Sequence, residues 1–132
     1  MTVVDASVLV EALVSGSAHG RAARGRLTQE PQLLAPYLVD IEVANAIRRL
    51  EASGAVPPAL AATAIVQLRQ LPVTRVSHTP FLPRIWELRS SITPYDAVYV
   101  ALAEAAGTPL LTADTRLASA PAIDCQIELL NP

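Results

Sequence analysis

The apolar residues of this chain follow two alternating spacings. The β-branched run 2–4 predicts a short strand that ends at Asp5, and from Ala6 onward the apolar spacing becomes that of a helix. The same change recurs, with further strands predicted at 32–35, 73–76, 109–112 and 126–130. Helices are predicted at 21–27, 37–53, 58–68, 79–92 and 93–106, followed by a short helical turn through Leu117. This alternation predicts an α/β fold with a central, mostly parallel sheet flanked by helices.

The pattern also predicts which residues end each helix and which enter the core. Gly16 and Gly20 interrupt the chain before the helix at 21–27, and Gly54 and Gly107 are typical helix ends. Helical spacing assigns three or four apolar residues of each long helix to the core. For 37–53 these are Ile41, Ala44, Ile47 and Leu50, and for 58–68 they are Ala61, Ile65 and Leu68. Trp86 and Phe81 on the helix at 79–92 are more typical of packing than of base stacking.

Length and composition indicate a single globular domain. The 132 residues are 52% hydrophobic and 17% charged, without a repeat or a linker long enough to divide them, so we expect one domain over 1–132. No apolar run approaches the roughly 20 residues that span a bilayer, and the N-terminus lacks a signal-peptide pattern. We therefore expect a cytoplasmic protein without a membrane segment. The lone Cys125 predicts neither a disulfide nor a zinc site.

All ten basic residues are arginine, and the net charge is −2. The absence of lysine argues against phosphate-binding loops and Schiff-base chemistry, which require it. A negative net charge does not argue against nucleic acid as a partner, because the charges can be segregated on different faces. The helical arginines could contact RNA phosphates, or they could be ordinary solvated residues. They are Arg21, Arg24, Arg26, Arg48 and Arg49.

Four acidic residues are candidates for a shared site. Asp5 and Asp114 follow predicted strands, and the carboxyl ends of parallel strands are where α/β sheets bind ligands. Asp96 lies in the first turn of one helix and Glu42 near the start of another, so both can face the same end. Converging carboxylates repel one another unless a divalent cation such as Mg²⁺ binds between them. Each acid has an alternative role as a helix cap, a turn residue or a solvated side chain, and spacing alone leaves both open.

Four segments resemble, in order, the successive motifs of PIN-domain toxins of the VapC family. They are VVDASVLVEAL, YLVDIEVANAIRRL, ITPYDAVYVALAEAAGTPLLTAD and TRLA, and together they span nearly the whole chain. The resemblance implies a PIN-like fold whose catalytic, metal-binding carboxylates are Asp5, Glu42, Asp96 and Asp114, with Asp40 outside the set. It makes Ser7 and Thr112 supporting hydroxyls near the first and last acids. Some relatives carry another acid where this chain has Leu117, which favours one bound ion over two.

The same resemblance implies the function. We expect a Mg²⁺- or Mn²⁺-dependent endoribonuclease, the toxin of a toxin–antitoxin pair, that cleaves structured RNA such as tRNA or rRNA. A homodimer and a cognate VapB-type antitoxin are the implied protein partners. One alternative is a catalytically inert PIN-like binding domain. Another is an aspartyl-phosphate phosphatase, although that class favours a second aspartate where Ser7 stands and a lysine that this chain lacks.

Overall fold

Five short strands, each parallel to its neighbours, form the centre of the computed structural model, which describes residues 1–132. Their order across the sheet is β3-β2-β1-β4-β5. The strands are β1 (Thr2–Val4), β2 (Leu33–Pro36), β3 (Val73–Val76), β4 (Leu110–Thr112) and β5 (Ile127–Leu129). All five match predicted strands to within one or two residues. The prediction of a mostly parallel sheet is confirmed, and the observed sheet is parallel throughout.

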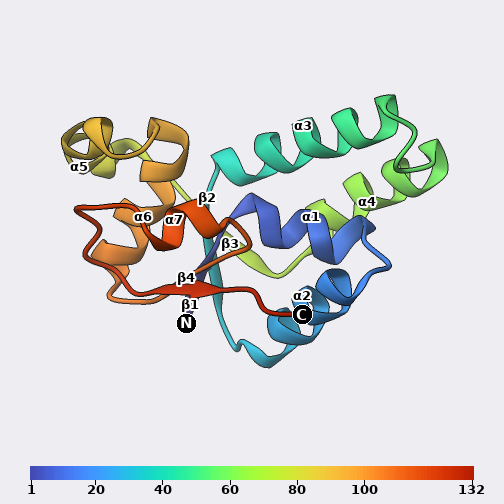
Figure 1. Cartoon of the computed structure of the whole chain (residues 1–132), viewed down its shortest axis with the longest axis horizontal. Coiled ribbons are helices and arrows are strands. Elements are labelled where there is room, and N and C mark those ends of the chain that lie inside the picture. The colour runs from blue at the N-terminus through green and yellow to red at the C-terminus, as the bar shows by residue number, and fades with distance from the viewer.

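Helices cover both faces of this sheet (Figure 1). On one side lie α1 to α4, with α1 in contact with the other three. On the other side α6 packs directly against β1, β2 and β4, and α5 packs on α6. The helices are α1 (Ala6–Val14), α2 (Ala18–Gln29), α3 (Leu38–Ala52), α4 (Pro58–Gln70), α5 (Leu82–Glu87), α6 (Pro94–Ala106) and the short α7 (Thr115–Ala118). No helix is both long and apolar enough to cross a bilayer.

The order of the strands reverses its direction at β1. The chain moves from β1 outward to β2 and β3, then returns past β1 to form β4 and β5 on the other side. Where the strand order reverses, the connections that leave two adjacent strands run in opposite directions along the sheet. This leaves a crevice at the carboxyl ends of those two strands. Here these are β1 and β4, paired through Val3 and Leu110. We call this end of the sheet the carboxyl edge and the opposite end the amino edge.

The core is one cluster of 29 buried apolar residues on both faces of the sheet. Val3 and Val4 of β1 have no exposed surface, as expected for a central parallel strand. In α6 the seven residues from Ala97 to Ala103 are all buried, because the helix lies between the sheet and α5. It ends at Gly107, whose φ of 64° is the left-handed conformation that glycine adopts readily. This rigid helix fixes the position of Asp96 in its first turn.

The core faces predicted for α3 and α4 are partly wrong. In α3 the fully or nearly buried residues are Val39, Val43 and Ile47, whereas Ile41 is 68% exposed. Both sets follow helical spacing and share Ile47, so the spacing alone does not decide which face meets α1. In α4 the buried set contains Ala64 in place of the predicted Ile65, which is exposed.

Two local predictions about helix boundaries are also corrected. The predicted helix at 79–92 divides into a 3₁₀ turn (Thr79–Phe81), α5 and a second 3₁₀ turn (Leu88–Ser90). Pro80 and Pro83 each occupy the first turn of a new segment, the helical position that tolerates a missing N–H. Gly20 does not precede α2 but lies buried within it, where an added Cβ would sit 2.0 Å from the carbonyl oxygen of Ser15. Gly20 is therefore needed because α2 lies close to the backbone of Ser15, and it does not interrupt the helix.

Candidate active site

Asp5 lies at the centre of the carboxyl edge, between β1 and α1. Its backbone N–H donates to the carbonyl of Leu111 in β4 at 3.1 Å, which continues the β1–β4 pairing by one residue. Its side chain caps α1 by accepting the backbone N–H of Ser7 at 3.0 Å. The residue is only 7% exposed, so its carboxylate is placed by the sheet and the first helix together.

Two hydroxyl groups hold the Asp5 carboxylate and connect it to β4. The Ser7 hydroxyl donates to Oδ1 and the Thr112 hydroxyl donates to Oδ2. The Ser7 hydroxyl also accepts the backbone N–H of Ala113 at 3.0 Å, and the Thr112 hydroxyl accepts that of Asp114 at 3.0 Å. Ser7 was expected beside the first acid. Thr112 was expected beside the last acid, Asp114. Its hydroxyl bonds both Asp114 and Asp5, so it connects the two acids.

Asp114 follows β4 and caps the short helix α7. Its Oδ1 accepts the backbone N–H of Arg116 at 2.9 Å. The guanidinium of Arg116 covers the same carboxylate, with Nε 3.2 Å from Oδ1 and Nη2 3.0 Å from Oδ2. The Arg116 side chain is 88% exposed. Sequence reasoning did not single out this arginine, although its place two residues after a strand-end acid was a usable signal.

The other two acids come from α3 and α6. Glu42 accepts a hydrogen bond at Oε1 from the hydroxyl of Tyr99, a buried residue of α6, so the two helices are joined beside the site. Sequence reasoning did not identify Tyr99 as part of the site, because nothing local links it to Glu42. Asp96 lies in the first turn of α6, where its backbone N–H donates to the Thr93 hydroxyl at 3.3 Å. Its carboxylate lines a hollow of about 340 Å³ together with Asp114 and Arg116.

The electrostatics show that the four acids influence one another. Burial raises the pKa of Asp5, and the Ser7 and Thr112 hydroxyls oppose that rise. Burial also raises the pKa of Glu42, and the negative charges of Asp96 and Asp5 raise it further. Asp96 has a raised pKa because of burial and then the charge of Asp114. Only Asp114 has a lowered pKa, and the hydrogen bond from Arg116 is the main cause.

The donor set fits a hard divalent cation, but the structure does not contain a formed metal centre. Four carboxylates offer the oxygen ligands that Mg²⁺ prefers. However, no three acidic, histidine or cysteine side chains are close enough together to hold a metal ion as they stand. Hydroxyl groups hold Asp5 and Glu42, and Arg116 holds Asp114. Side chains would therefore have to move to bring these oxygens around one ion.

Several other candidate residues belong to different parts of the molecule. Asp40, which was predicted to lie outside the acidic set, pairs with Arg75 at 2.8 Å. For the helical arginines, RNA contact and a solvated role were both left open. Arg21 and Arg24 donate to backbone carbonyls of the α1–α2 region, and Arg26 pairs with two glutamates. Trp86 is 65% exposed beneath the guanidinium of Arg89, so the packing role predicted for it is wrong.

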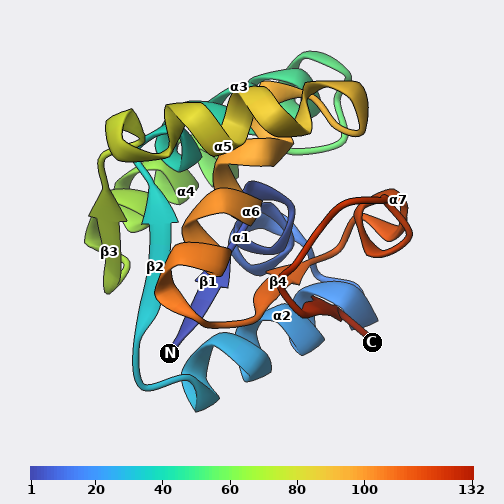
Figure 2. The ribbon, with the colours of Figure 1, turned by 90° about the vertical axis from the view of Figure 1, so that its left-hand side faces the viewer.

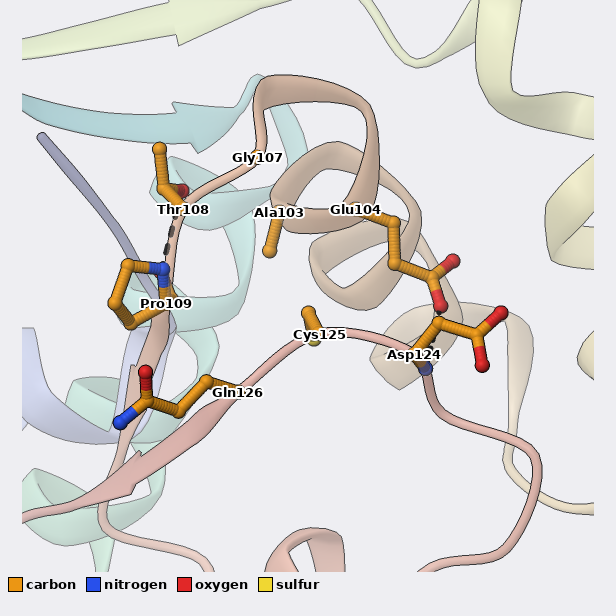
Figure 3. A pocket seen from close by; sticks show the side chains of 8 residues that line it. All are labelled: Ala103, Glu104, Gly107, Thr108, Pro109, Asp124, Cys125 and Gln126. Atoms are coloured by element: carbon orange, nitrogen blue, oxygen red, sulfur yellow. Dashed lines mark hydrogen bonds between the residues drawn. The ribbon is translucent and has the colours of Figure 1, made fainter.

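A further pocket lies at the amino edge, away from the four acids (Figure 3). It is lined by residues that precede β4 and β5, among them Thr108, Cys125 and Gln126. Cys125 is a free thiol, and burial raises its pKa to about 11, so it is protonated near neutral pH. A protonated thiol is a poor nucleophile.

The sequence was compared with protein families and with curated proteins. The PIN domain family matches residues 2–123. Ribonuclease VapC1 of Mycobacterium tuberculosis is 43% identical over 130 residues, covering 98% of this chain and 97% of the relative. The chain belongs to the VapC group of PIN-domain proteins. Ribonuclease VapC3 of the same organism is 42% identical over 118 residues, covering 89% and 85% of the two chains.

Solved structures support the fold of this PIN domain. VapBC2 from Rickettsia felis, bound to a promoter DNA fragment, superposes with a TM-score of 0.71 at 12% identity and covers 98% of both chains. VapC20 of M. tuberculosis, described as a sarcin–ricin loop cleaving toxin, superposes with a TM-score of 0.66 at 16% identity, covering 83% of this chain and 87% of that one. At these identities the likeness concerns the fold. The family resemblance and the PIN-like α/β fold expected from the sequence are therefore confirmed.

Proposed function

We propose that this PIN domain is a Mg²⁺- or Mn²⁺-dependent endoribonuclease and the toxin of a toxin–antitoxin pair, acting on structured RNA such as tRNA or rRNA in the cytoplasm. The observation that carries the proposal is the electrostatic coupling of four acids from four separate segments at the carboxyl edge. In three of them the pKa is raised by burial, and in two of these a neighbouring carboxylate raises it further. Such coupled, partly buried acids are typical of functional sites.

The carboxylates Asp5, Glu42, Asp96 and Asp114 are the proposed ligands of the cation. A divalent ion held there would stabilise the negative charge that develops on an RNA phosphate during hydrolysis. Ser7 and Thr112 orient the two oxygens of Asp5, and Tyr99 orients Glu42. Leu117 is apolar and only 3% exposed, so it offers no ligand for a second ion. We therefore propose one tightly held cation.

Two hollows flank these acids and offer room for an RNA strand. On one side a cleft of about 540 Å³ between α1 and α3 is lined by Ser7, Glu42 and Arg49. On the other side is the smaller hollow lined by Asp96, Asp114 and Arg116. An arginine in each hollow supplies the positive charge that RNA phosphates need beside an acidic centre.

We also propose a homodimer and a VapB-type antitoxin as protein partners. Five large apolar side chains, on α3, α5 and α6 and at the residue before α3, are between 51% and 68% exposed. Exposed apolar residues on neighbouring elements are typical of protein interfaces. Figure 2 shows α3 and α5 at the top of the molecule, above α6, and Figure 1 shows that the two helices are separated along its horizontal axis. These residues are Tyr37, Ile41, Leu82, Trp86 and Tyr95.

The interface proposal is tested by the mass of the protein in solution. We expect sedimentation of the purified chain to give the mass of a dimer and Trp86→Glu to give that of a monomer. Val66→Glu is the matched control, because Val66 is similarly exposed but lies on α4, which contributes no residue to this set. A wild-type monomer at micromolar concentration would contradict the dimer.

The enzymatic proposal is tested by incubating total RNA with the purified protein. We expect discrete fragments with Mg²⁺ or Mn²⁺, none with EDTA, and none with Asp96→Asn. The amide keeps the shape of the side chain but loses the charge that attracts the cation. Circular dichroism establishes that the variant is folded. Cleavage that persists in EDTA or in folded Asp96→Asn would contradict the carboxylate site, and absence of cleavage by the antitoxin-free protein in either metal would favour an inert binding domain.

A further inference from the structure

Arg116 differs from the other arginines that form ion pairs. Arg26, Arg75 and Arg84 are between 17% and 29% exposed, and each bonds an acid at least 20 residues away in sequence, so each ties separate segments together. Arg116 is 88% exposed and bonds an acid two residues away. An exposed pair between near neighbours contributes little to stability. The fold therefore gains almost nothing from this contact.

The contact nevertheless covers an oxygen that the proposed cation would need. The Oδ1 atom of Asp114 accepts hydrogen bonds from both the backbone N–H and Nε of Arg116, whereas Oδ2 accepts only one, from Nη2 of Arg116. A guanidinium 3.0 Å from Oδ2 repels a second cation, so a metal ion that binds Oδ2 competes with this ion pair. Asp96 and Arg116 also interact electrostatically, so the arginine faces both acids of the hollow.

A guanidinium released from Asp114 could bind an anion in the adjacent hollow. The hollow beside Asp114 is lined by Ser91, Thr93 and Ser119 as well as by the two acids, and Arg116 is its only basic residue. Its volume of about 340 Å³ exceeds that of a phosphate group. A guanidinium suits phosphate because it forms two parallel hydrogen bonds to two oxygens.

We propose that Arg116 is an exchangeable counter-ion, which neutralises Asp114 while the cation is absent and binds an RNA phosphate in the neighbouring hollow once the cation engages Asp114. The exchange makes the substrate-binding group available only when the metal site is filled. This proposal rests on the proposed function, since it requires a cation at the carboxylates and RNA as the substrate.

The first test measures Mn²⁺ affinity by isothermal titration calorimetry, without RNA. The proteins are wild type, Arg116→Ala, Arg116→Lys and Arg69→Ala, in which an exposed arginine of α4 is lost at the same change in net charge. Removing an exposed ion pair that competes with the cation should tighten Mn²⁺ binding by about two- to fivefold in Arg116→Ala. Arg69→Ala should match wild type, and Arg116→Lys should fall between them.

The second test measures the salt dependence of kcat/KM at saturating Mn²⁺ for cleavage within a single-stranded loop of a structured RNA that the total-RNA assay shows to be cut. Loss of one phosphate contact should reduce the slope of log(kcat/KM) against log[NaCl] by about 0.7 in Arg116→Ala. Arg116→Lys should retain the slope, because a lysine keeps the point charge. A residue with a purely structural role would change neither the Mn²⁺ affinity in this direction nor the salt slope.

The outcomes separate this proposal from the proposed function. If wild type takes up no Mn²⁺, or if Asp96→Asn takes it up equally well, the carboxylate site fails and the exchange fails with it. If wild type binds Mn²⁺ and Asp96→Asn does not, the carboxylate site stands. The exchange is then overturned if Arg116→Ala binds Mn²⁺ no more tightly than Arg69→Ala, or if its salt slope equals that of wild type.

Discussion

The two edges of the sheet both contain clusters of acidic side chains, but the clusters have opposite properties. At the amino edge Glu30 bonds the N-terminal amine at 2.7 Å and Arg26 at 3.0 Å, and its pKa falls to about 2. Glu104 pairs there with Arg84 through two hydrogen bonds, which lower its pKa. At the carboxyl edge burial raises the pKa of Asp5, Glu42 and Asp96.

The difference lies in the partners of the acids. Amino-edge carboxylates bond cationic groups that are part of the fold, so their charge is already neutralised. Apart from Asp114, carboxyl-edge acids bond neutral hydroxyl groups or face other acids, so their charge is not neutralised by the protein. A group of acids is therefore a candidate functional site when no cationic group of the protein neutralises its charge, so that a ligand can do so. The number of acids alone does not distinguish such a site from a structural cluster.

The largest expected difference between the edges is in RNA cleavage. We expect Asp5→Asn to reduce the initial rate in Mg²⁺ by at least about 100-fold, because groups that merely support a metal site already account for about 10- to 100-fold. Asparagine is also a good helix cap, so α1 should persist. Glu128→Gln changes an acid of β5 that bonds Arg26, the partner of Glu30, and this variant should cleave within about twofold of wild type. If both variants lost the same fraction of the cleavage rate, the acids at the carboxyl edge would not be functionally distinct from the other acids.

The next largest effect is on stability, and it should come from the amino edge. Glu104→Gln should lower the free energy of unfolding by about 2 kcal/mol in urea titrations, because it weakens charge-assisted hydrogen bonds and leaves Arg84 poorly paired. Glu87→Gln removes a 65%-exposed partner of the same arginine and should cost less than about 0.5 kcal/mol. If both variants lowered the free energy of unfolding by the same amount, the partly buried Arg84–Glu104 pair would not stabilise the fold more than the exposed pair does.

A smaller effect is expected from the hydroxyl group that supports Glu42. Tyr99→Phe should weaken Mn²⁺ binding about tenfold in calorimetry, since groups that orient metal ligands have effects of about 10- to 100-fold. Tyr95→Phe is the matched control on the same helix, because Tyr95 is 62% exposed and its hydroxyl bonds none of the acids. Unchanged Mn²⁺ affinity in Tyr99→Phe would show that Glu42 does not depend on this hydrogen bond.

The smallest expected effect is a pH-dependent change in stability, with opposite signs at the two edges. The raised pKa of Asp96 means that folding favours its neutral form, so ionisation costs stability above pH 3.8. In EDTA at pH 7, Asp96→Asn should therefore be more stable than wild type, by less than about 1 kcal/mol because water screens this half-buried group. The gain should vanish as the pH falls below 3.8.

Glu104→Gln provides the opposite case for the same urea titrations. The lowered pKa of Glu104 means that its ionised form stabilises the fold above pH 4.5, and that this stabilisation is lost as the pH falls through the folded pKa. The cost of Glu104→Gln should therefore shrink toward low pH. If Asp96→Asn instead destabilised the metal-free protein at pH 7, the uncompensated charge inferred at the carboxyl edge would be wrong.

Local patterns in the sequence determined the elements of this protein and the candidate acids. Alternation between β-branched runs and helical spacing identified all five strands, because a central parallel strand must be apolar on both faces. Asp5 and Asp114 could be selected because they follow strands whose carboxyl ends meet at one edge. Their assignment as metal ligands remains a prediction, supported by the family resemblance and by the coupled charges.

Only the tertiary structure decided which groups surround each acid. Ile41 and Val43 fit helical spacing on α3 equally well, and the packing of α3 against α1 determined that Val43 is buried. Tyr99 meets Glu42 across 57 residues, and Thr112 meets Asp5 across 107. Such contacts depend on how helices and strands pack, and no local pattern encodes that packing. For this reason the sequence identified the acids, whereas the fold determined which of them are neutralised within the protein and which are left for a ligand.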